Sequence, residues 1–293
     1  MVTGLLVVAG VLGGAAPVAA PEFLPVAERP PIRAAAVREA SGLAVSRRDP
    51  GRLWVVNDSG AGAELHAVGV DGAEQGRVTV SGARNVDWED LASFTRDGKP
   101  WLLVADTGDN QARRAECVLY LVEEPELPAG AVRVAREIRF RYAGGPRDCE
   151  AVAVDAAGGR ILLVSKRTEP PEVHELALDP PAGGGVATTT RVGTLRVAAP
   201  AGTLLPFRDQ PTGLDIAADG SLAAVVTYHG VFLFARRGGE AWARAFAREP
   251  RLLAPHRLVQ AESVAVAADG AALFVVSEGR GSPVVCYRRG AAG

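Results

Sequence analysis

The chain has little net charge, few cysteines and only two lysines, Lys99 and Lys166. Its 293 residues carry a formal net charge of −2, so no overall field draws the protein to nucleic acid or anionic lipid. The cysteines, Cys117, Cys149 and Cys286, form no CxxC pair, which argues against a structural zinc site. One disulfide could form, with Cys117 and Cys149 favoured because they lie in neighbouring repeats; three reduced thiols are the alternative.

Motifs of nucleophilic and phosphate chemistry are also missing from the sequence. It contains no Gly-x-Ser-x-Gly, no His-Glu-x-x-His and no glycine-rich phosphate loop that opens a helix. The sequence therefore offers no sign of a serine-hydrolase elbow, a zinc protease helix or a nucleotide-binding loop.

Long apolar runs are absent except at the N-terminus, where residues 4–20 are small and apolar. This run is typical of a signal peptide, although no basic residue precedes it and Pro21 follows the best cleavage position. We expect a signal peptide over 1–20, an extended Pro-rich segment over 21–32 and a secreted or periplasmic protein. A buried or disordered N-terminal segment is the alternative. No transmembrane segment is expected in the mature chain, since spanning needs about 20 apolar residues.

A motif repeated five times dominates the rest of the chain. Each copy is an apolar run, a turn rich in Asp and Gly, and a second apolar run that ends in polar residues. The first runs begin at Ser41, Glu89, Glu150, Thr212 and Glu262. The period of about fifty to sixty residues is that of a propeller blade or a solenoid unit.

The strand pattern within the repeats predicts an all-β protein, a five-bladed β-propeller of four-stranded antiparallel blades over residues 33–293. The expected strands are 43–46, 53–57, 64–69 and 76–81; 91–95, 101–106, 117–123 and 134–142; 151–155, 161–165, 172–177 and 187–197; 213–217, 222–228, 231–236 and 242–247; and three in the last copy, ending at Tyr287. Residues 240–248 would also suit a helical turn. An N-terminal strand over 33–38 would complete the last blade and close the ring. A six-bladed ring, with a degenerate blade in 178–211, is the alternative.

Polar residues flank the first two strands of every copy, and in a propeller these positions meet at one mouth of the central channel. The first column is Ser41, Glu89, Glu150, Thr212 and Glu262, and the second is Asp58, Asp106, Lys166, Tyr228 and Glu278. A further ring lies two residues before the first column, at Glu39, Asp87, Asp148, Gln210 and Gln260. Carboxylates gathered at a narrow mouth need a counter-charge or raised pKa values.

A divalent cation, above all Ca²⁺, would supply that counter-charge through carboxylate and amide oxygens. The candidate metal ligands are Asn57, Asp58, Asp87, Glu89, Asp106, Asp109, Asn110 and Glu278. Basic residues could supply the counter-charge instead, as salt-bridge partners, or could contact an anionic ligand. These residues are Arg147, Lys166, Arg167 and Arg208. Turn hydrogen bonds between blades are the structural alternative for the same polar positions. Trp88 is expected to contribute to blade packing rather than to stack on a ligand.

The form Gly-Leu-Ala-Val, Asp-Gly, Leu-x-Val-Val-x-Asp resembles the NHL, SMP-30/gluconolactonase and strictosidine-synthase group of propellers. The stretches Asp87–Ala92 and Ala105–Asn110 also resemble a family of secreted bacterial propellers of unassigned activity. The lactonase-like resemblance implies a divalent metal in the channel, at positions that match Asn57, Asp58, Glu89, Asp106, Glu150 and Glu262. Lys166 and Tyr228, and a count of five blades, depart from that pattern.

Two functions follow as hypotheses. The first is a monomeric envelope protein whose acidic mouth binds a small molecule or a protein partner. The alternative is a metal-dependent hydrolase of a lactone, ester or phosphoester. In the second, Glu150 or Glu262 would act as the base, Lys166 or Arg167 would steady the anion, and His229 is a further candidate base or ligand.

Overall fold

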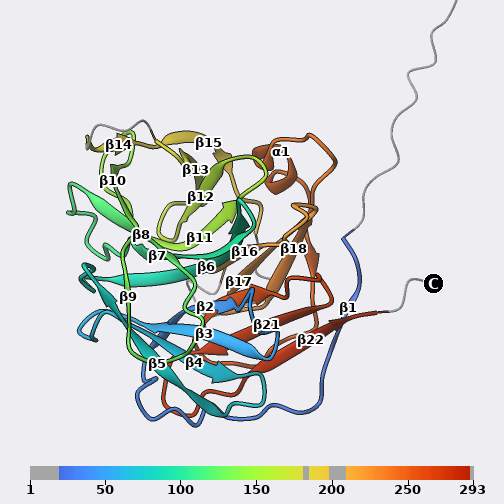
Figure 1. The fold of residues 1–293 in the computed structure, drawn as a ribbon. Coiled ribbons are helices and arrows are strands. Elements are labelled where there is room, and N and C mark those ends of the chain that lie inside the picture. Colours follow the sequence, from blue (N-terminus) through green and yellow to red (C-terminus); the bar gives the residue numbers. More distant parts are fainter. Residues whose placement is uncertain (1–19, 181–184, 198–208, 291–293) are drawn as a thin grey trace, which may run out of the picture.

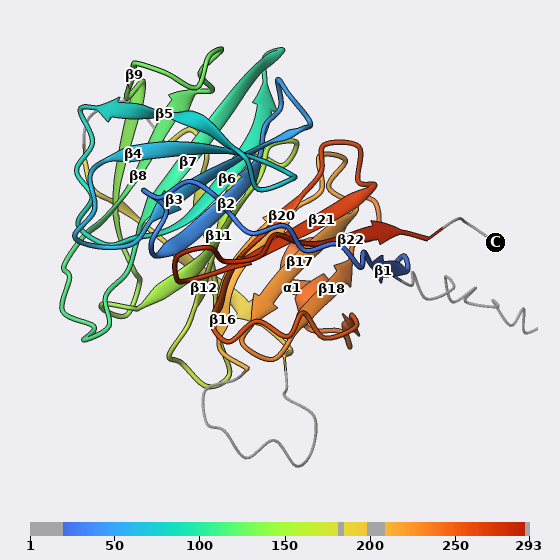
Figure 2. The same cartoon turned by 90° about the horizontal axis from the view of Figure 1, so that it is seen from below.

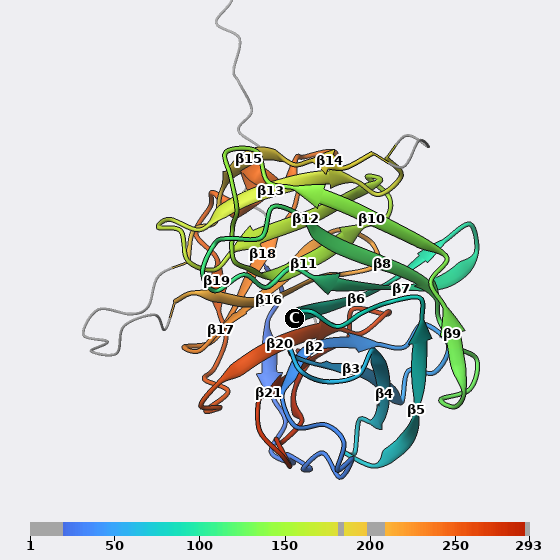
Figure 3. The same ribbon diagram turned by 90° about the vertical axis from the view of Figure 1, so that its left-hand side faces the viewer.

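Five sheets surround a central axis in the computed structural model, which describes residues 20–180, 185–197 and 209–290 (Figure 1). The innermost strand of each sheet contacts the innermost strands of both neighbours, in a closed order. These strands lie together in the middle of the molecule in Figure 3. They are β2 (Ala40–Val45), β6 (Trp88–Arg96), β11 (Cys149–Asp155), β16 (Pro211–Ile216) and β20 (Ala261–Val266). The predicted five-bladed propeller is confirmed, and the described residues form no sixth sheet.

Each blade continues outward from its innermost strand by antiparallel pairing. Blade 1 adds β3 (Arg52–Asn57), β4 (Glu64–Gly69) and β5 (Glu74–Ser81); blade 2 adds β7 (Lys99–Asp106), β8 (Cys117–Glu123) and β10 (Arg136–Arg141); blade 3 adds β12 (Arg160–Ser165), β13 (Glu172–Ala177) and β15 (Thr190–Thr194); blade 4 adds β17 (Leu222–Thr227), β18 (Val231–Ala235) and β19 (Arg251–Leu252); blade 5 adds β21 (Ala272–Ser277), β22 (Val285–Arg289) and β1 (Phe23–Pro25). Most of these strands agree with the sequence prediction.

Two short strands link the outer edges of neighbouring blades. β9 (Ala131–Arg133) comes from the blade 2 sequence and pairs in parallel with β5 of blade 1. β14 (Ala187–Thr188) precedes β15 of blade 3 and pairs in parallel with β10 of blade 2. Both cover a sheet edge that would otherwise expose unpaired backbone groups.

The strand that closes the ring comes from the N-terminal side, as predicted, but the predicted residues are wrong. Residues 33–38 form no strand; Ala34 and Val37 are buried in a turn, and the Val37 amide donates to the Ala34 carbonyl. The closing strand is β1, which lies within the predicted Pro-rich segment and pairs with β22 (Figures 1 and 2). An outermost strand tolerates Pro25, since its free side needs no ladder hydrogen bond. Residues 1–19 of the predicted signal peptide lie outside the described residues.

The strand predicted over 242–247 is a helical turn instead, α1 (Trp242–Phe246), and β19 completes the blade. In a strand, Arg244 would share a face with Trp242 and Phe246. The helix places those two rings together, with centroids 5.4 Å apart, while Arg244 stays exposed. Within the described parts of the chain, no helix has the length and apolar character needed to cross a membrane.

The hydrophobic core lies between blades rather than inside one of them. The described residues form five buried clusters, and each cluster joins two neighbouring blades around the ring. Trp88 is fully buried in the cluster between blades 1 and 2, and its indole N–H donates to the Arg84 carbonyl over 2.9 Å. Its predicted packing role is confirmed. No cysteine is bridged: Cys117 and Cys149 are buried thiols and Cys286 is half-buried.

Two fully buried carboxylates join the innermost strands. Asp90 accepts hydrogen bonds from the amides of Leu91 (2.8 Å), Val152 (2.8 Å) and Leu214 (3.2 Å), which lie on three different blades. Asp215 accepts from Ile216 (2.8 Å) and from Val266 (2.7 Å) of the next blade. Buried amides without an acceptor would cost free energy, so these side chains hold the centre of the ring together.

Asp90→Asn should destabilise the protein by about 2–3 kcal/mol. An asparagine has one acceptor oxygen, so in either orientation its NH₂ group faces at least one of the three amide donors. Urea unfolding of the two proteins would measure the difference.

Asp97→Asn is the matched control, because Asp97 is an exposed hairpin residue with 87% of its side chain accessible. It should change stability by less than about 0.5 kcal/mol. Equal unfolding midpoints for Asp90→Asn and the wild type would contradict the role given to Asp90.

Candidate functional site

Every innermost strand contains a β-bulge at the same point. The register with the second strand shifts between Ala40 and Gly42 in blade 1, and the skipped residue is Ser41. The corresponding skipped residues are Glu89, Glu150, Thr212 and Glu262. The five residues of the first column are therefore structurally equivalent. A bulge leaves its extra residue unpaired and redirects its side chain, which accounts for the shared position of these residues.

The bulge residues divide into two kinds. Ser41 donates a hydrogen bond to the Trp88 carbonyl over 2.7 Å, and Thr212 donates to the Ala261 carbonyl over 2.6 Å. Both acceptors belong to the next blade, so these two hydroxyls are structural. Glu89, Glu150 and Glu262 are buried carboxylates at the mouth.

The second column needs a correction at one position. The bulge partner Trp88 pairs with Asp106, just as Ala40 pairs with Asn57. Asp106 is therefore equivalent to Asn57, and Thr107 is the true equivalent of Asp58. The difference arises because the hairpin between β6 and β7 is longer than the others, which shifts the spacing on which the sequence alignment depended.

Asn57 and Asp106 hold the loops that precede the innermost strands. Asn57 Oδ1 accepts the amides of Arg38 and Glu39 over 2.9 and 3.1 Å. Asp106 accepts the amides of Val86 (3.1 Å) and Asp87 (3.3 Å) and forms an ion pair of 2.7 Å with Arg114. Because their oxygens already have donors, neither residue is a good cation ligand.

Asp109 and Asn110 also have partners of their own. The Asp109 carboxylate accepts the amides of Arg113 and Arg114 over 2.8 and 2.7 Å. Asn110 accepts a hydrogen bond from Arg167. These contacts order the loop after β7 and bring Gly108 against the mouth.

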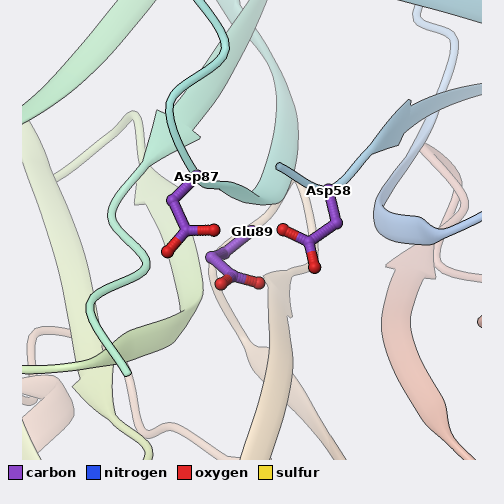
Figure 4. A group of neighbouring side chains, drawn as sticks. All are labelled: Asp58, Asp87 and Glu89. Atoms are coloured by element: carbon purple, nitrogen blue, oxygen red, sulfur yellow. The ribbon is translucent and has the colours of Figure 1, made fainter. Parts of the chain in front are cut away.

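Three other candidates do come together, as Figure 4 shows: Asp58, Asp87 and Glu89 point toward one another. Each offers a carboxylate oxygen within 4.8 Å of the oxygens of the other two. Asp58 accepts a hydrogen bond from the Ser59 amide. Glu89 is only 6% exposed, and within the described chain its carboxylate has no hydrogen bond or ion pair. A buried carboxylate in this position carries an uncompensated electrostatic cost.

The electrostatics of this group reflect that cost. Burial raises the pKa of Glu89 well above its ordinary value, and Glu150, Asp58 and Asp87 add to the increase. Burial, together with Asp58, raises the pKa of Asp87 to about 6. Gly108 makes the grouping possible, because a Cβ at this position would overlap both Glu89 Oε1 and Asp87 Oδ2.

The opposite side of the mouth is a chain of hydrogen-bonded side chains. Lys166 donates to Glu150 and, over 3.3 Å, to the Tyr228 hydroxyl. That hydroxyl donates to Glu262 Oε1 over 2.7 Å. Burial raises the pKa of Glu150 to about 7, with Lys166 opposing the rise, and burial raises the pKa of Glu262 to about 8. Burial opposes the charge of Lys166, but the two glutamates outweigh it and raise the pKa of the ammonium.

The remaining predicted residues lie around these two groups. Arg167 pairs with Asp148 over 2.6 Å, whereas Arg147 lies against Glu172 over 2.8 Å. Glu278 accepts a hydrogen bond from Gln260 over 2.9 Å. His229 is half-buried after β17, where its amide donates to Thr227. Arg208 lies outside the described residues.

Asp148 and Tyr228 were not among the sequence-based site candidates. Asp148 belongs to the ring of polar residues two positions before the bulges, and its carboxylate accepts from both Arg167 and the Asp109 amide, the latter over 2.9 Å. Tyr228 is the second-column residue of blade 4 and joins Lys166 to Glu262. Their positions in the columns were the available signal, but their residue types alone did not distinguish them from turn residues.

Comparisons with known proteins add the fold alone. No protein-family model matches the chain, and no curated protein does. Among solved structures, the chain is similar to the Myxococcus xanthus glutaminyl cyclase, with 12% identity and a TM-score of 0.52 over 92% of this chain and 99% of that one. It is also similar to a chain of the nidogen/laminin complex, with 13% identity and a TM-score of 0.46 over 82% of this chain and 73% of that one. The chain is a β-propeller; the narrower NHL and SMP-30 grouping stays a prediction.

Glu262→Gln should remove a pH dependence of stability. The raised pKa means that the folded protein keeps this proton while the unfolded chain loses it as the pH rises from about 4.5 to about 8. The wild-type contribution to stability therefore falls across that window. Relative to the wild type, the variant should gain about 3.5 kcal/mol between pH 5 and pH 8, measured by urea unfolding in EDTA.

Glutamine keeps an acceptor for the Tyr228 hydroxyl, so the variant tests charge rather than packing. Glu137→Gln, at an exposed position of β10, is the control and should show no such trend. Stability curves for Glu262→Gln and wild type that run parallel with pH would refute the expectation.

Proposed function

We propose that the mouth binds one divalent cation through Asp58, Asp87 and Glu89. The observation that carries the proposal is the Glu89 carboxylate, which is more than nine-tenths buried, lies between two other carboxylates and lacks a counter-charge among the described residues. Burial and, after it, repulsion between the carboxylates raise the pKa values of Asp87 and Glu89, and a cation would offset both. The residues present therefore fit a cation chemically.

Ca²⁺ is the preferred ion. All three ligands are hard carboxylate oxygens, with no thiolate or imidazole in the group. Two ligands on opposite sides of a Ca²⁺ ion lie about 4.8 Å apart, since each Ca–O distance is about 2.4 Å. Oxygens that are mutually within 4.8 Å can therefore surround a single ion.

The function that this site supports best is binding. Ca²⁺ takes about 6 to 8 oxygen ligands, so three carboxylates would leave coordination positions for a further ligand. The ligand class that fits is a small molecule, or a loop of an envelope protein, that presents carbonyl or carboxylate oxygens. An envelope location rests on the predicted signal peptide and stays a prediction.

The direct test is thermal unfolding in EDTA and then with Ca²⁺, Mg²⁺, Mn²⁺ or Zn²⁺. An ion at a hundred times its Kd adds about 2.7 kcal/mol, which corresponds to a Tm increase on the order of 5–10 °C. We expect Ca²⁺ to give this increase in the wild type. Glu89→Gln should abolish the increase while it preserves the fold.

Gly108→Ala provides a second test, because its methyl group would displace the Glu89 and Asp87 oxygens. It should weaken Ca²⁺ binding at least tenfold. Gly238→Ala is the control, since a Cβ there meets no atom within 4 Å. No Tm shift with any ion, or an unchanged shift in Glu89→Gln, would rule the cation site out.

A metal-dependent hydrolase of a lactone, ester or phosphoester is the second candidate, favoured by the chain from Glu150 to Glu262. The two glutamates have pKa values of about 7 and 8, in the range suited to proton transfer near neutral pH. Bound beside them, a cation would supply Lewis-acid chemistry. Glu150 or Glu262 would then accept or return the proton, and Lys166 would hold Glu150 and Tyr228 in position.

Turnover of lactone, carboxylic ester and phosphoester substrates with Ca²⁺, Mg²⁺, Mn²⁺ or Zn²⁺ distinguishes the two candidates. A hydrolase should lose at least a hundredfold in kcat/KM in the double variant Asp87→Asn, Glu89→Gln. Ligand capture without turnover would favour the binding protein. Turnover that survives unchanged in the double variant would exclude the metal-dependent hydrolase.

A further inference from the structure

A pocket with a volume of about 370 Å³ lies on the mouth side of blade 1, between the residues that precede β2 and the loop that joins β3 to β4. The loop contributes residues 59–62, Ser-Gly-Ala-Gly, whose side chains are too short to fill this space. Asn57 and His66 also line the pocket. Its volume is within the range of pockets that bind small molecules.

The hydrogen bonds of Asn57 fix the protonation of His66, which is only 3% exposed. Asn57 Oδ1 accepts the amides of Arg38 and Glu39, so the other end of this side chain is the NH₂ group. That group donates to the Ala36 carbonyl over 3.0 Å and to His66 Nε2 over 3.1 Å. Because Nε2 accepts a hydrogen bond, it carries no proton. His66 is therefore neutral with its proton on Nδ1, and burial also lowers its pKa.

The Nδ1–H group of His66 has no partner of its own. Among the described residues nothing accepts a hydrogen bond from it, and Nδ1 is not one of the unbonded atoms that are closed to solvent. The group therefore opens into the pocket that His66 lines. A donor held in this way at a concave site is suited to orient a bound acceptor.

The histidine at the equivalent position of blade 3 provides a contrast. His66 pairs with Val55 of β3, and His174 pairs with Leu163 of β12. Each of these two partners lies two residues before the end of its strand. His174 is fully buried, and both of its ring nitrogens have hydrogen-bond partners within 3.2 Å. The open Nδ1–H is therefore a feature of the blade 1 pocket and not of this position in a blade.

We propose that this pocket binds a small ligand through a carboxylate or amide oxygen that accepts the Nδ1–H of His66. Arg38 also lines the pocket and has no ion pair among the described residues, so its guanidinium would favour a carboxylate. Glu39 and Glu64 line the same pocket and would oppose one. The neutral donor of His66 suits both kinds of oxygen, which the probes below distinguish.

The pocket adjoins the proposed cation site, but the two can be tested separately. Asn57 and Ser59, on either side of Asp58, line the pocket, whereas none of the three proposed cation ligands does. Experiments in EDTA therefore test the pocket alone. Failure of the pocket would leave the cation proposal intact, and failure of the cation proposal would leave the pocket intact.

The first test is the position of the proton on His66, read from two-bond ¹H–¹⁵N correlations of the histidine rings at pH 8 in EDTA. We expect the proton on Nδ1. The chain has only four histidines, and His66→Phe identifies the signal by its loss. A proton on Nε2 would overturn the proposal, because Nδ1 would then have nothing to donate.

The second test is titration with sodium acetate and with acetamide at constant ionic strength, followed at His66 Nδ1 and at the backbone amides of residues 59–62. At least one probe should cause saturable shifts there and none at His174. Methylammonium chloride has no acceptor and should cause none. Tighter binding of acetate would assign the pocket to carboxylates, and equal or tighter binding of acetamide would assign it to neutral amides. No saturable shift with either probe would overturn the proposal.

His66→Phe should weaken the binding of the preferred probe at least tenfold, because the phenyl ring has a similar shape but no donor. The backbone amides of residues 59–62 report binding in this variant, and its Tm in EDTA shows whether it folds. Unchanged affinity in the folded variant would contradict the role of His66. If the variant does not fold, the spectra of the wild type still decide the question.

Discussion

The free edges of the innermost strands are the constraint on which this propeller depends. Five strands converge on one axis, and on their inner side no further strand is available to pair with them. Asp90 satisfies amides of blades 2, 3 and 4 at once, and Asp215 joins blade 4 to blade 5. The innermost strands also lie close together. Position 42 requires glycine, because a Cβ there would lie 2.7 Å from the backbone of Asp90. Buried carboxylates join blades 2 to 5 at the centre, and the pairing of β1 with β22 closes the ring at its edge.

The centre of the ring and the candidate site share one structural device. Glu89 and Asp90 are consecutive residues, and the bulge between β6 and β7 separates their directions. Asp90 reaches the amides inside the ring, while Glu89 joins the carboxylates at the mouth. All five blades repeat the bulge, so the fold supplies five equivalent positions. The residue type then decides the contacts of each position: a hydroxyl binds the next blade, and a glutamate joins the polar side chains at the mouth.

Periodicity was enough to predict the fold, because strand spacing and turn residues repeat in every blade. Periodicity did not predict the places where a blade departs from the repeat. The alternation of Trp242, Arg244 and Phe246 suits a strand, whereas tertiary contacts, with Phe234 for Phe246 and with Asp155 for Trp242, accompany the helix. At the mouth, the sequence predicted the columns but not which oxygens were already in use. Asn57 and Asp106 looked like ligands, yet backbone amides occupy their oxygens, and that occupancy depends on the loop conformation rather than on spacing.

The two halves of the mouth solve the same electrostatic problem differently. Around Glu150 the positive charge is part of the chain, at a fixed distance and always present. Around Glu89 no such charge exists within the described residues, although this carboxylate is equally buried. Burying a carboxylate without a partner costs several kcal/mol. That cost is comparable to the net free energy of unfolding of a whole domain. The chain therefore supplies a lysine to one buried glutamate and none to the other, and this contrast is the reason why we propose a cation from solution at Glu89.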